Sequence, residues 1–333
     1  GDARKRVLVP TSAHGTNPAT AAFVGYAVEE VAQTPCGRVD LEDLAAKLGP
    51  DVAALMITNP NTCGLFERDM VEIARLVHAA GAYLYADGAN FNAVVGKVRP
   101  ADLGVDAMHI NLHKTFSTPH GGGGPGAGPV VLSEALAPYA PAPWLVPDGD
   151  GLALHEHTEG TASFGRLSAF HGQMGMYVRA LAYMLSHGAD GLAQVAEDAV
   201  LNANYVKARL GGTLSAPFGG YCMHEALFDD AWLEGTGVTT LDFAKALIDE
   251  GFHPMTMYFP LVVHGAMLIE PTETEPKAEI DRFCDAVLAL AGAARAGDIE
   301  RFKGAPFRAP LRRLDETQAA RKPRLRWSPP EQG

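Results

Sequence analysis

Residues 82–90, AYLYADGAN, and residues 106–114, DAMHINLHK, decide the fold of this chain. Each is a short apolar run that ends in a charged side chain, Asp87 in the first and Lys114 in the second. Runs of this length followed by turn residues are typical of buried strands. In an open α/β sheet, ligands bind beyond the carboxyl ends of the strands. Asp87 and Lys114, each closing its predicted strand, are therefore expected to face one crevice.

The segments around these two runs alternate between strand and helix patterns. Further strands are predicted at 5–10, 52–58 and 128–133. Helices are predicted at 19–31, with Ala21, Val24, Val28 and Val31 on one face, at 39–48, with Asp40 as N-cap, and around Met70, Ile73, Ala74 and Val77. This alternation predicts a mostly parallel sheet that is covered on both faces.

The second half of the chain has a different pattern. After the Pro/Gly-rich segment 138–151, apolar residues at helical spacing predict one long helix, through Phe164, Leu167, Phe170, Met174, Val178, Leu181 and Leu185. We expect a large cofactor-binding domain over 1–190, a smaller α+β domain over 191–305, and a basic, Pro-rich tail over 306–333 that lies on a surface or on a partner subunit. Because the chain runs straight into a strand, an N-terminal part of the large domain is expected to be missing.

Composition excludes several classes of protein. The 333 residues are 47% hydrophobic, and the net charge of −12 disfavours a nucleic-acid surface. No apolar run approaches the ~20 residues that a membrane span needs, and the start has no signal-peptide pattern. The four scattered cysteines indicate reduced thiols in the cytoplasm rather than a disulfide framework or a zinc site.

Asp87 and Lys114 together indicate one kind of chemistry, although either alone could be an ordinary loop residue. A lysine amine can condense with an aldehyde cofactor. A carboxylate can keep a pyridine nitrogen protonated, which makes the ring an electron sink. The glycine-rich loop 121–128 that follows Lys114 would let backbone amides approach a ligand or a second chain closely.

Six stretches extend this pattern over essentially the whole chain: TSAHGTNPATA (11–21), ITNPNTCGLFE (57–67), YADGANFNA (85–93), NLHKTFSTPHGGGGPG (111–126), YFPLVVHGAMLIEPTETEPK (258–277) and RRLDETQAARKPRLRW (312–327). They resemble the P-protein of the glycine cleavage system, the pyridoxal-phosphate-dependent glycine decarboxylase. Lys114 and the closing segment are similar to subunit 2 of the two-subunit bacterial type. The resemblance implies the aminotransferase-like fold of fold-type I pyridoxal-phosphate enzymes.

The resemblance also implies roles for single residues. Lys114 matches the lysine that binds the aldehyde of pyridoxal 5'-phosphate, and Asp87 matches the partner of its ring nitrogen. His14 would stack on one face of the ring and Ala89 would pack on the other. His113 would lie near the cofactor, either at the phosphate or as a proton shuttle. Thr16 is a further candidate for the cofactor site, as a donor or simply a turn residue, and His14 alone could equally be a loop histidine bonded to Thr16 or Asn17.

The implied activity is decarboxylation of glycine and transfer of the aminomethyl group to the lipoyl arm of H-protein, in a heterotetramer with P-protein subunit 1. No arginine stands out as a clamp for the glycine carboxylate among Arg166, Arg179, Arg282, Arg295 and Arg301. Such a clamp would stabilise the ground state and oppose loss of the carboxylate. The main phosphate-binding turn is expected in the missing N-terminal segment, unless His113, Thr115 and the loop 121–128 supply it.

Four alternatives carry less weight. Another fold-type I enzyme, such as an aminotransferase or a cysteine desulfurase, fits Asp87 and Lys114 but not the closing segments. A metal hydrolase would use His109 and His113, but on a strand these lie ~13 Å apart, and HEH at 155–157 is a second weak candidate; no metal is expected. A P-loop needs its glycines before the lysine, and a non-catalytic scaffold would not need Lys114, Asp87 and His14.

Overall fold

The computed structural model describes residues 4–121, 125–156 and 158–329. Its main sheet has the strand order β2-β1-β3-β4-β5-β6. The strands are β1 (Arg6–Pro10), β2 (Ala27–Val31), β3 (Val52–Thr58), β4 (Tyr83–Gly88), β5 (Ala107–Ile110) and β6 (Val130–Leu132). All neighbours are parallel except β5 and β6, which are antiparallel. The mostly parallel sheet expected from the sequence is therefore confirmed.

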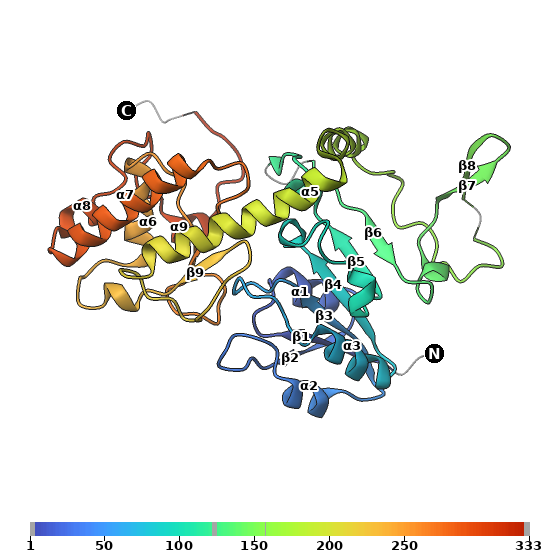
Figure 1. The fold of residues 1–333 in the computed structure, drawn as a ribbon. Coiled ribbons are helices and arrows are strands. Elements are labelled where there is room, and N and C mark those ends of the chain that lie inside the picture. Colours follow the sequence, from blue (N-terminus) through green and yellow to red (C-terminus); the bar gives the residue numbers. More distant parts are fainter. Residues whose placement is uncertain (1–3, 122–124, 157, 330–333) are drawn as a thin grey trace.

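The strands β1 to β4 of this sheet are connected along the chain by helices, namely α1 (Thr16–Phe23), α2 (Leu41–Lys47) and α3 (Met70–Ala79) (Figure 1). The expected cap of α2 is present, because the carboxylate of Asp40 accepts hydrogen bonds from the amides of Glu42 and Asp43. The apolar stripe of α3 is buried in a core with residues from β1 to β4; its members are Met70, Ile73, Ala74 and Val77.

Two predicted elements end earlier than expected. The helix predicted at 19–31 is wrong beyond Phe23, because Gly25 has a φ of +95° and residues 27–31 form β2, which pairs with β1. The strand predicted at 106–114 stops at Ile110 and continues as the short helix α4 (Leu112–Thr115). Leu112 and Phe116, four residues apart, lie one above the other on one face of this helical turn and are both buried in one core cluster.

The long helix α5 (Met174–Leu210) begins later than the sequence pattern predicted. Phe164, Leu167 and Phe170 precede it, outside any helix, and their side chains are 67%, 78% and 63% exposed. Within α5, Gly188 has φ 64° and ψ −175°, so the helix breaks there. Figure 1 shows the two halves of α5 running in different directions. The hairpin of β7 (Trp144–Asp148) and β8 (Gly151–His155) extends away from the main sheet.

The chain after α5 builds a second core. A sheet with the order β10-β11-β9 is antiparallel throughout and consists of β9 (Ala226–Phe228), β10 (Thr256–Met257) and β11 (Met267–Ile269). Helices α6 (Thr240–Asp249), α7 (Lys277–Arg295) and α8 (Ile299–Lys303) accompany it, and α9 (Glu316–Arg321) follows in the exposed tail. Its centre contains Phe228, Phe243 and Phe302, all fully buried. Short 3-10 turns lie at Phe91–Ala93, Pro100–Leu103, Ala137–Tyr139 and Ala231–Leu233.

None of the helices in the described ranges is long and apolar enough to cross a membrane.

Candidate active site

Asp87 lies at the carboxyl end of β4, as the sequence predicted, and is 5% exposed. Its side-chain partner is His109, which the strand register places beside it on β5. The His109 Nε2 atom is 3.1 Å from Asp87 Oδ1, and the amide of Ala89 donates to the same oxygen at 2.9 Å. The next residue must be glycine, because a Cβ atom at Gly88 would lie 2.0 Å from the carbonyl oxygen of His109.

This arrangement keeps Asp87 ionised. Burial by itself would raise the pKa of Asp87, but the contact with His109 and the positive charge of Lys114 outweigh burial and hold the pKa below its usual value. On the other side of the His109 ring, the Tyr85 hydroxyl lies 2.5 Å from Nδ1. Burial and the nearby Asp87 charge raise the pKa of Tyr85 to about 12, so its hydroxyl stays a proton donor. His109 is therefore oriented by Tyr85 towards Asp87.

Lys114 lies on α4, one helical turn beyond β5, rather than at the end of the strand. Its side chain is exposed, and its amine makes no hydrogen bond or ion pair with any residue in the described ranges. Its positive charge nevertheless acts on Asp87, His113, His224, Glu225 and Glu270. The Lys114 amino group is thus unpaired among the described residues and lies near a group of acidic and imidazole side chains.

Several buried polar atoms around α4 lack a partner among the described residues. They are His113 Nδ1, Thr115 Oγ1, Asn92 Oδ1 and Thr58 Oγ1. A buried polar atom without a hydrogen bond is costly. Burial, and then the charges of His120 and Lys114, lower the pKa of His113, so its ring is a neutral donor or acceptor near pH 7. These orphaned atoms fit a polar ligand, such as a cofactor carrying a phosphate group.

The other predicted residues take different positions. His14 is exposed, its Nδ1 atom lies 3.0 Å from Thr16 Oγ1, and its ring meets the edge of Phe259 with centroids 5.6 Å apart. His14 thus has the local bond to Thr16 that a loop histidine would have, and it also faces the second domain. Ala89, two residues after Asp87, is half-buried. The stacking roles of His14 and Ala89 stay predictions.

The sequence reasoning missed three residues that the part of the chain after α5 brings to the site: His224, Glu225 and Glu270. Glu225 directly precedes β9 and Glu270 directly follows β11. Because Ala226 pairs with Ile269 in the antiparallel register, the two glutamates lie beside each other. They are held to the loop after β4 by Asn92 Nδ2, which donates to Glu270 Oε1 at 3.1 Å, and by Asn90 Nδ2, at 3.5 Å from Glu225 Oε2. The sequence signal that could have found the two glutamates is a charged residue at the end of each of two short apolar strands.

The five candidate arginines are all engaged elsewhere. Arg179 donates to the carbonyl of Ser117 and Arg295 to that of Thr213, while Arg166, Arg282 and Arg301 bind Glu156, Glu279 and Glu250. The part of the glycine loop at 122–124 lies outside the described residues, so its expected contact with a ligand stays a prediction.

The expectation that His109 and His113 lie on one strand is wrong, since β5 ends at Ile110 and His113 is on helix α4. The two rings have different surroundings: His109 contacts Asp87 and Tyr85, whereas His113 packs against His120 with centroids 4.8 Å apart. The HEH motif includes residue 157, which lies outside the described residues.

Comparisons with known proteins fit this geometry. A family profile described as aminotransferase class V matches residues 3–127, and one described as the glycine dehydrogenase C-terminal domain matches residues 195–305. A probable glycine dehydrogenase (decarboxylating) subunit 2 of Kosmotoga olearia is 49% identical over 330 residues, which cover 99% of this chain and 68% of that protein. The chain belongs to the glycine dehydrogenase (decarboxylating) subunit 2 family. The protein of the same name from Caulobacter vibrioides is 80% identical over 98% of this chain, which spans 63% of its length.

Solved structures of low identity show the same fold. A glycine decarboxylase (P-protein) of the glycine cleavage system, in inhibitor-bound form, superimposes with a TM-score of 0.71 at 20% identity, covering 86% of this chain and 66% of the other. A NifS-like protein from Rickettsia africae has a TM-score of 0.63 at 14% identity, covering 86% and 76%. The expected aminotransferase-like α/β fold of this family is therefore confirmed.

Proposed function

We propose that this chain is the lysine-bearing subunit of a pyridoxal-phosphate-dependent glycine decarboxylase, and that the aminomethyl group of glycine passes to the lipoyl arm of H-protein. The observation that carries the proposal is the free amine of Lys114, which acts on the buried carboxylate of Asp87 at the carboxyl edge of the sheet in a chain of this family. Bound pyridoxal phosphate would supply an electron sink for the bond that breaks when the carboxylate leaves.

The residues of this chain would divide the work as follows. Lys114 would hold the cofactor aldehyde through its amine. Asp87, kept ionised by His109, would hold a proton on the ring nitrogen, which is electrostatic preorganisation of the site. Ala89 and His14 would pack on the two faces of the cofactor ring. Thr16 would hold the His14 side chain in place. His113 and Thr115, whose buried polar atoms lack partners among the described residues, would donate to the phosphate.

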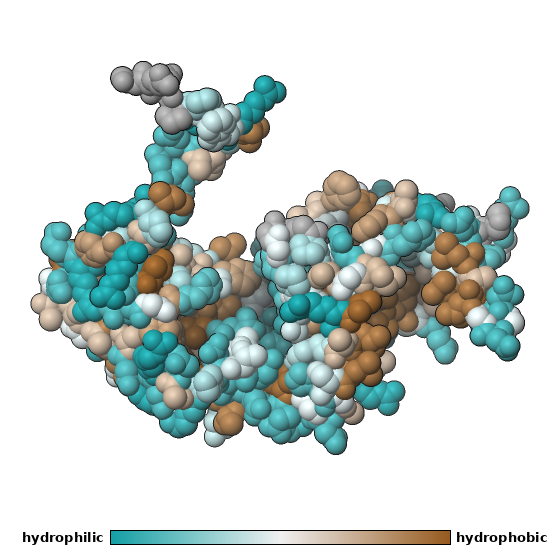
Figure 2. All heavy atoms as spheres, turned by 90° about the horizontal axis from the view of Figure 1, so that it is seen from above, coloured by the Kyte–Doolittle hydropathy of each residue, from teal (hydrophilic) through white to brown (hydrophobic). Residues whose placement is uncertain are grey.

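An exposed apolar surface supports the proposed partner, P-protein subunit 1. We define it as the outer side chains of residues 164–185, where Leu167 and Leu185 are 78% and 75% exposed, together with the hairpin β7–β8, where Leu152 is 67% exposed. Figure 2 shows hydrophobic side chains gathered at the end of the molecule that carries this hairpin. Exposed apolar surface of this extent is typical of a protein interface, and the name of the relatives, subunit 2, indicates a companion chain. A cytoplasmic heterotetramer stays a prediction.

The decisive experiment is release of carbon dioxide from glycine with pyridoxal phosphate and lipoylated H-protein, with and without subunit 1. We expect release that depends on both added proteins. Lys114→Ala should abolish the visible absorption of the bound cofactor and the adduct that borohydride traps. Lys97→Ala is the matched control, because Lys97 belongs to the same domain but is ion-paired with Glu197. A trapped adduct that survives in Lys114→Ala would refute the assignment.

A further inference from the structure

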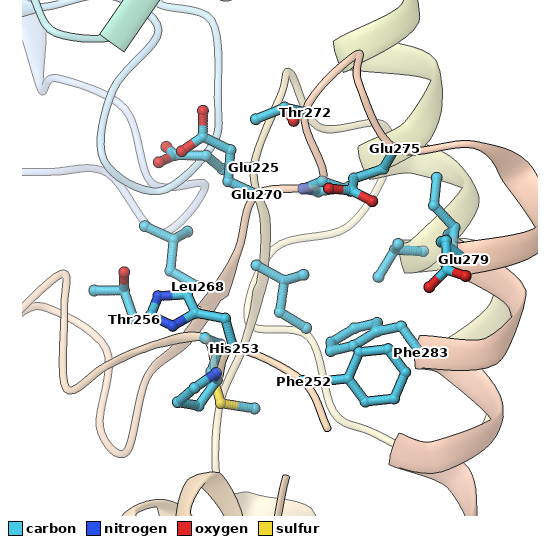
Figure 3. Close-up of a pocket in the computed structure, with 16 residues that line it drawn as sticks. Glu225, Phe252, His253, Thr256, Leu268, Glu270, Thr272, Glu275, Glu279 and Phe283 are labelled. Carbon is cyan, nitrogen blue, oxygen red and sulfur yellow. The ribbon is translucent and has the colours of Figure 1, made fainter. Parts of the chain in front are cut away.

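Glu225 and Glu270 form a pair of carboxyl groups to which the proposed function assigns no role. Figure 3 shows them side by side at one end of a pocket of about 420 Å³, with Phe252 and Phe283 at the other end. The side chain of Glu225 is 11% exposed, whereas that of Glu270 is 41% exposed. The pair therefore has one buried member and one member that water reaches.

His224 lies against both carboxyl groups and is 1% exposed. Its Nε2 atom is 3.9 Å from Glu225 Oε2 and 3.8 Å from Glu270 Oε1, distances too long for hydrogen bonds, and its Nδ1 atom has no partner among the described residues. Burial, and then the charge of Lys114, lower the pKa of His224 to about 3. His224 is consequently neutral near pH 7 and supplies no positive charge to the pair.

Within the described ranges, Lys114 is the one cation whose charge acts on the Glu225–Glu270 pair. Burial, and then the neighbouring Glu270 charge, raise the pKa of Glu225 well above its ordinary value, while Lys114 opposes the rise. Burial also raises the pKa of Glu270, against the hydrogen bond from Asn92 and the charge of Lys114, and the charge of Glu273 adds to the rise.

Two thiols also face Glu225. Burial raises the pKa of both Cys63 and Cys222 to about 11, so they carry no charge near pH 7.

Two carboxylates at one site do not both ionise readily beside a single ammonium group. Resting on the proposed function, we propose that Glu225 and Glu270 act as one unit that holds a single proton, with its remaining negative charge positioning the Lys114 amine. The more buried Glu225 carries the proton. A substrate carboxylate that entered the site near this negative charge would be disfavoured in the ground state rather than clamped.

A divalent cation is the competing occupant, because one ligand atom from each of His224, Glu225 and Glu270 lies within 4.8 Å of the others. The positive charge of Lys114 on all three groups opposes a second cation. Equilibrium dialysis of the protein against Zn²⁺ tests this directly. Stoichiometric binding that is lost in His224→Ala would overturn the proton-sharing pair.

Infrared difference spectroscopy of the cofactor-free protein tests the proton itself. At pH 7 we expect a carbonyl band of a protonated carboxylic acid in the wild-type protein that is absent from Glu225→Gln. Glu275→Gln is the matched control, because Glu275 lines the same pocket without belonging to the pair. In Glu270→Gln the band should weaken at pH 7, since loss of the neighbouring charge lowers the pKa of Glu225. A wild-type protein without the band would overturn the proposal, whatever the activity of the loaded enzyme.

The pH dependence of stability gives an independent measurement. A carboxyl group whose pKa is raised by folding stabilises the fold below its unfolded pKa and loses this contribution as pH rises through the folded pKa. Relative to wild type, Glu225→Gln should therefore show a urea midpoint that shifts upward between pH 5 and pH 8, and Glu275→Gln should not. If the urea midpoint of Glu225→Gln instead falls relative to wild type between pH 5 and pH 8, then Glu225 is ionised and paired in the folded protein. Because neither measurement needs glycine or cofactor, both can fail while the proposed function stands.

With the cofactor bound, the pH at which its visible absorption changes reports on protonation at the Lys114 nitrogen. We expect this pH to move in Glu270→Gln and to stay unchanged in Glu275→Gln. An unchanged value in Glu270→Gln would remove the positioning role, since a purely structural carboxyl group would not alter this signal.

Discussion

Gly64→Ala should destabilise the protein more than a positive backbone angle alone explains. Gly64 has a φ of +72°, and a Cβ atom there would lie 2.2 Å from the carbonyl oxygen of Glu225. Its own carbonyl accepts a hydrogen bond from the amide of Met223 at 2.8 Å, so the two segments are held in register. The left-handed conformation costs a non-glycine residue about 1–2 kcal/mol. Forced overpacking adds about 1–3 kcal/mol, so we expect a loss of roughly 2–5 kcal/mol in total.

Gly81→Ala separates these two contributions. Gly81 has a φ of +76°, and a Cβ atom there would have no neighbour within 4 Å. Urea unfolding of both variants, followed by circular dichroism, should give a loss of about 1–2 kcal/mol for Gly81→Ala and a clearly larger loss for Gly64→Ala. Equal losses would show that the Glu225 segment yields freely, and the account of how this segment is positioned would be wrong. In Gly64→Ala the infrared band assigned to Glu225 should also shift.

Two further predictions concern single carboxylates. Asp87→Asn should retain the cofactor but slow glycine decarboxylation by orders of magnitude, because an amide cannot keep the ring nitrogen protonated; near-normal turnover would reduce Asp87 to a turn residue. Asp242→Asn should remove about 2 kcal/mol of stability at pH 7, since despite burial the bonds of Asp242 with Lys303, Thr239 and Arg313 lower its pKa from 3.8 to about 2. This contribution is present above about pH 4 and is lost as pH falls through about 2, so an acid titration in which both proteins lose stability in parallel would contradict it.

Periodicity predicted the elements whose core-facing residues are local in sequence. The stripe from Met70 to Val77 became α3, and the cap at Asp40 began α2 as expected. Prediction failed where tertiary pairing decided the outcome. Residues 27–31 have apolar spacing that suits a helix, but they form an edge strand because β1 offers them a partner. The apolar residues within 164–170 have the spacing of a buried helix face, but their side chains are exposed.

The same distinction applies to the candidate site. Asp87 could be placed from its own strand, because a polar residue that ends an apolar run marks the carboxyl edge of the sheet. Its partner His109 depended on the register between β4 and β5, which sequence alone does not fix. Glu225 and Glu270 depended on an antiparallel pairing in another domain, 45 residues apart in sequence. Residues that act alone were therefore accessible to sequence reasoning, and residues that act as pairs across strands were not.

The break at Gly188 divides α5 into two helical segments. Its φ of 64° and ψ of −175° belong to a region that glycine alone adopts without strain. Ala180 of the first half and Ala196 of the second half both pack with Leu112 and Phe116 beside Lys114, and Val206 of the second half belongs to the core behind β9. Because α5 contacts the Lys114 segment on both sides of Gly188 and then enters the core that contains Ala226 and Ile269, one helix joins the segment that carries the lysine to the strands that carry the glutamates.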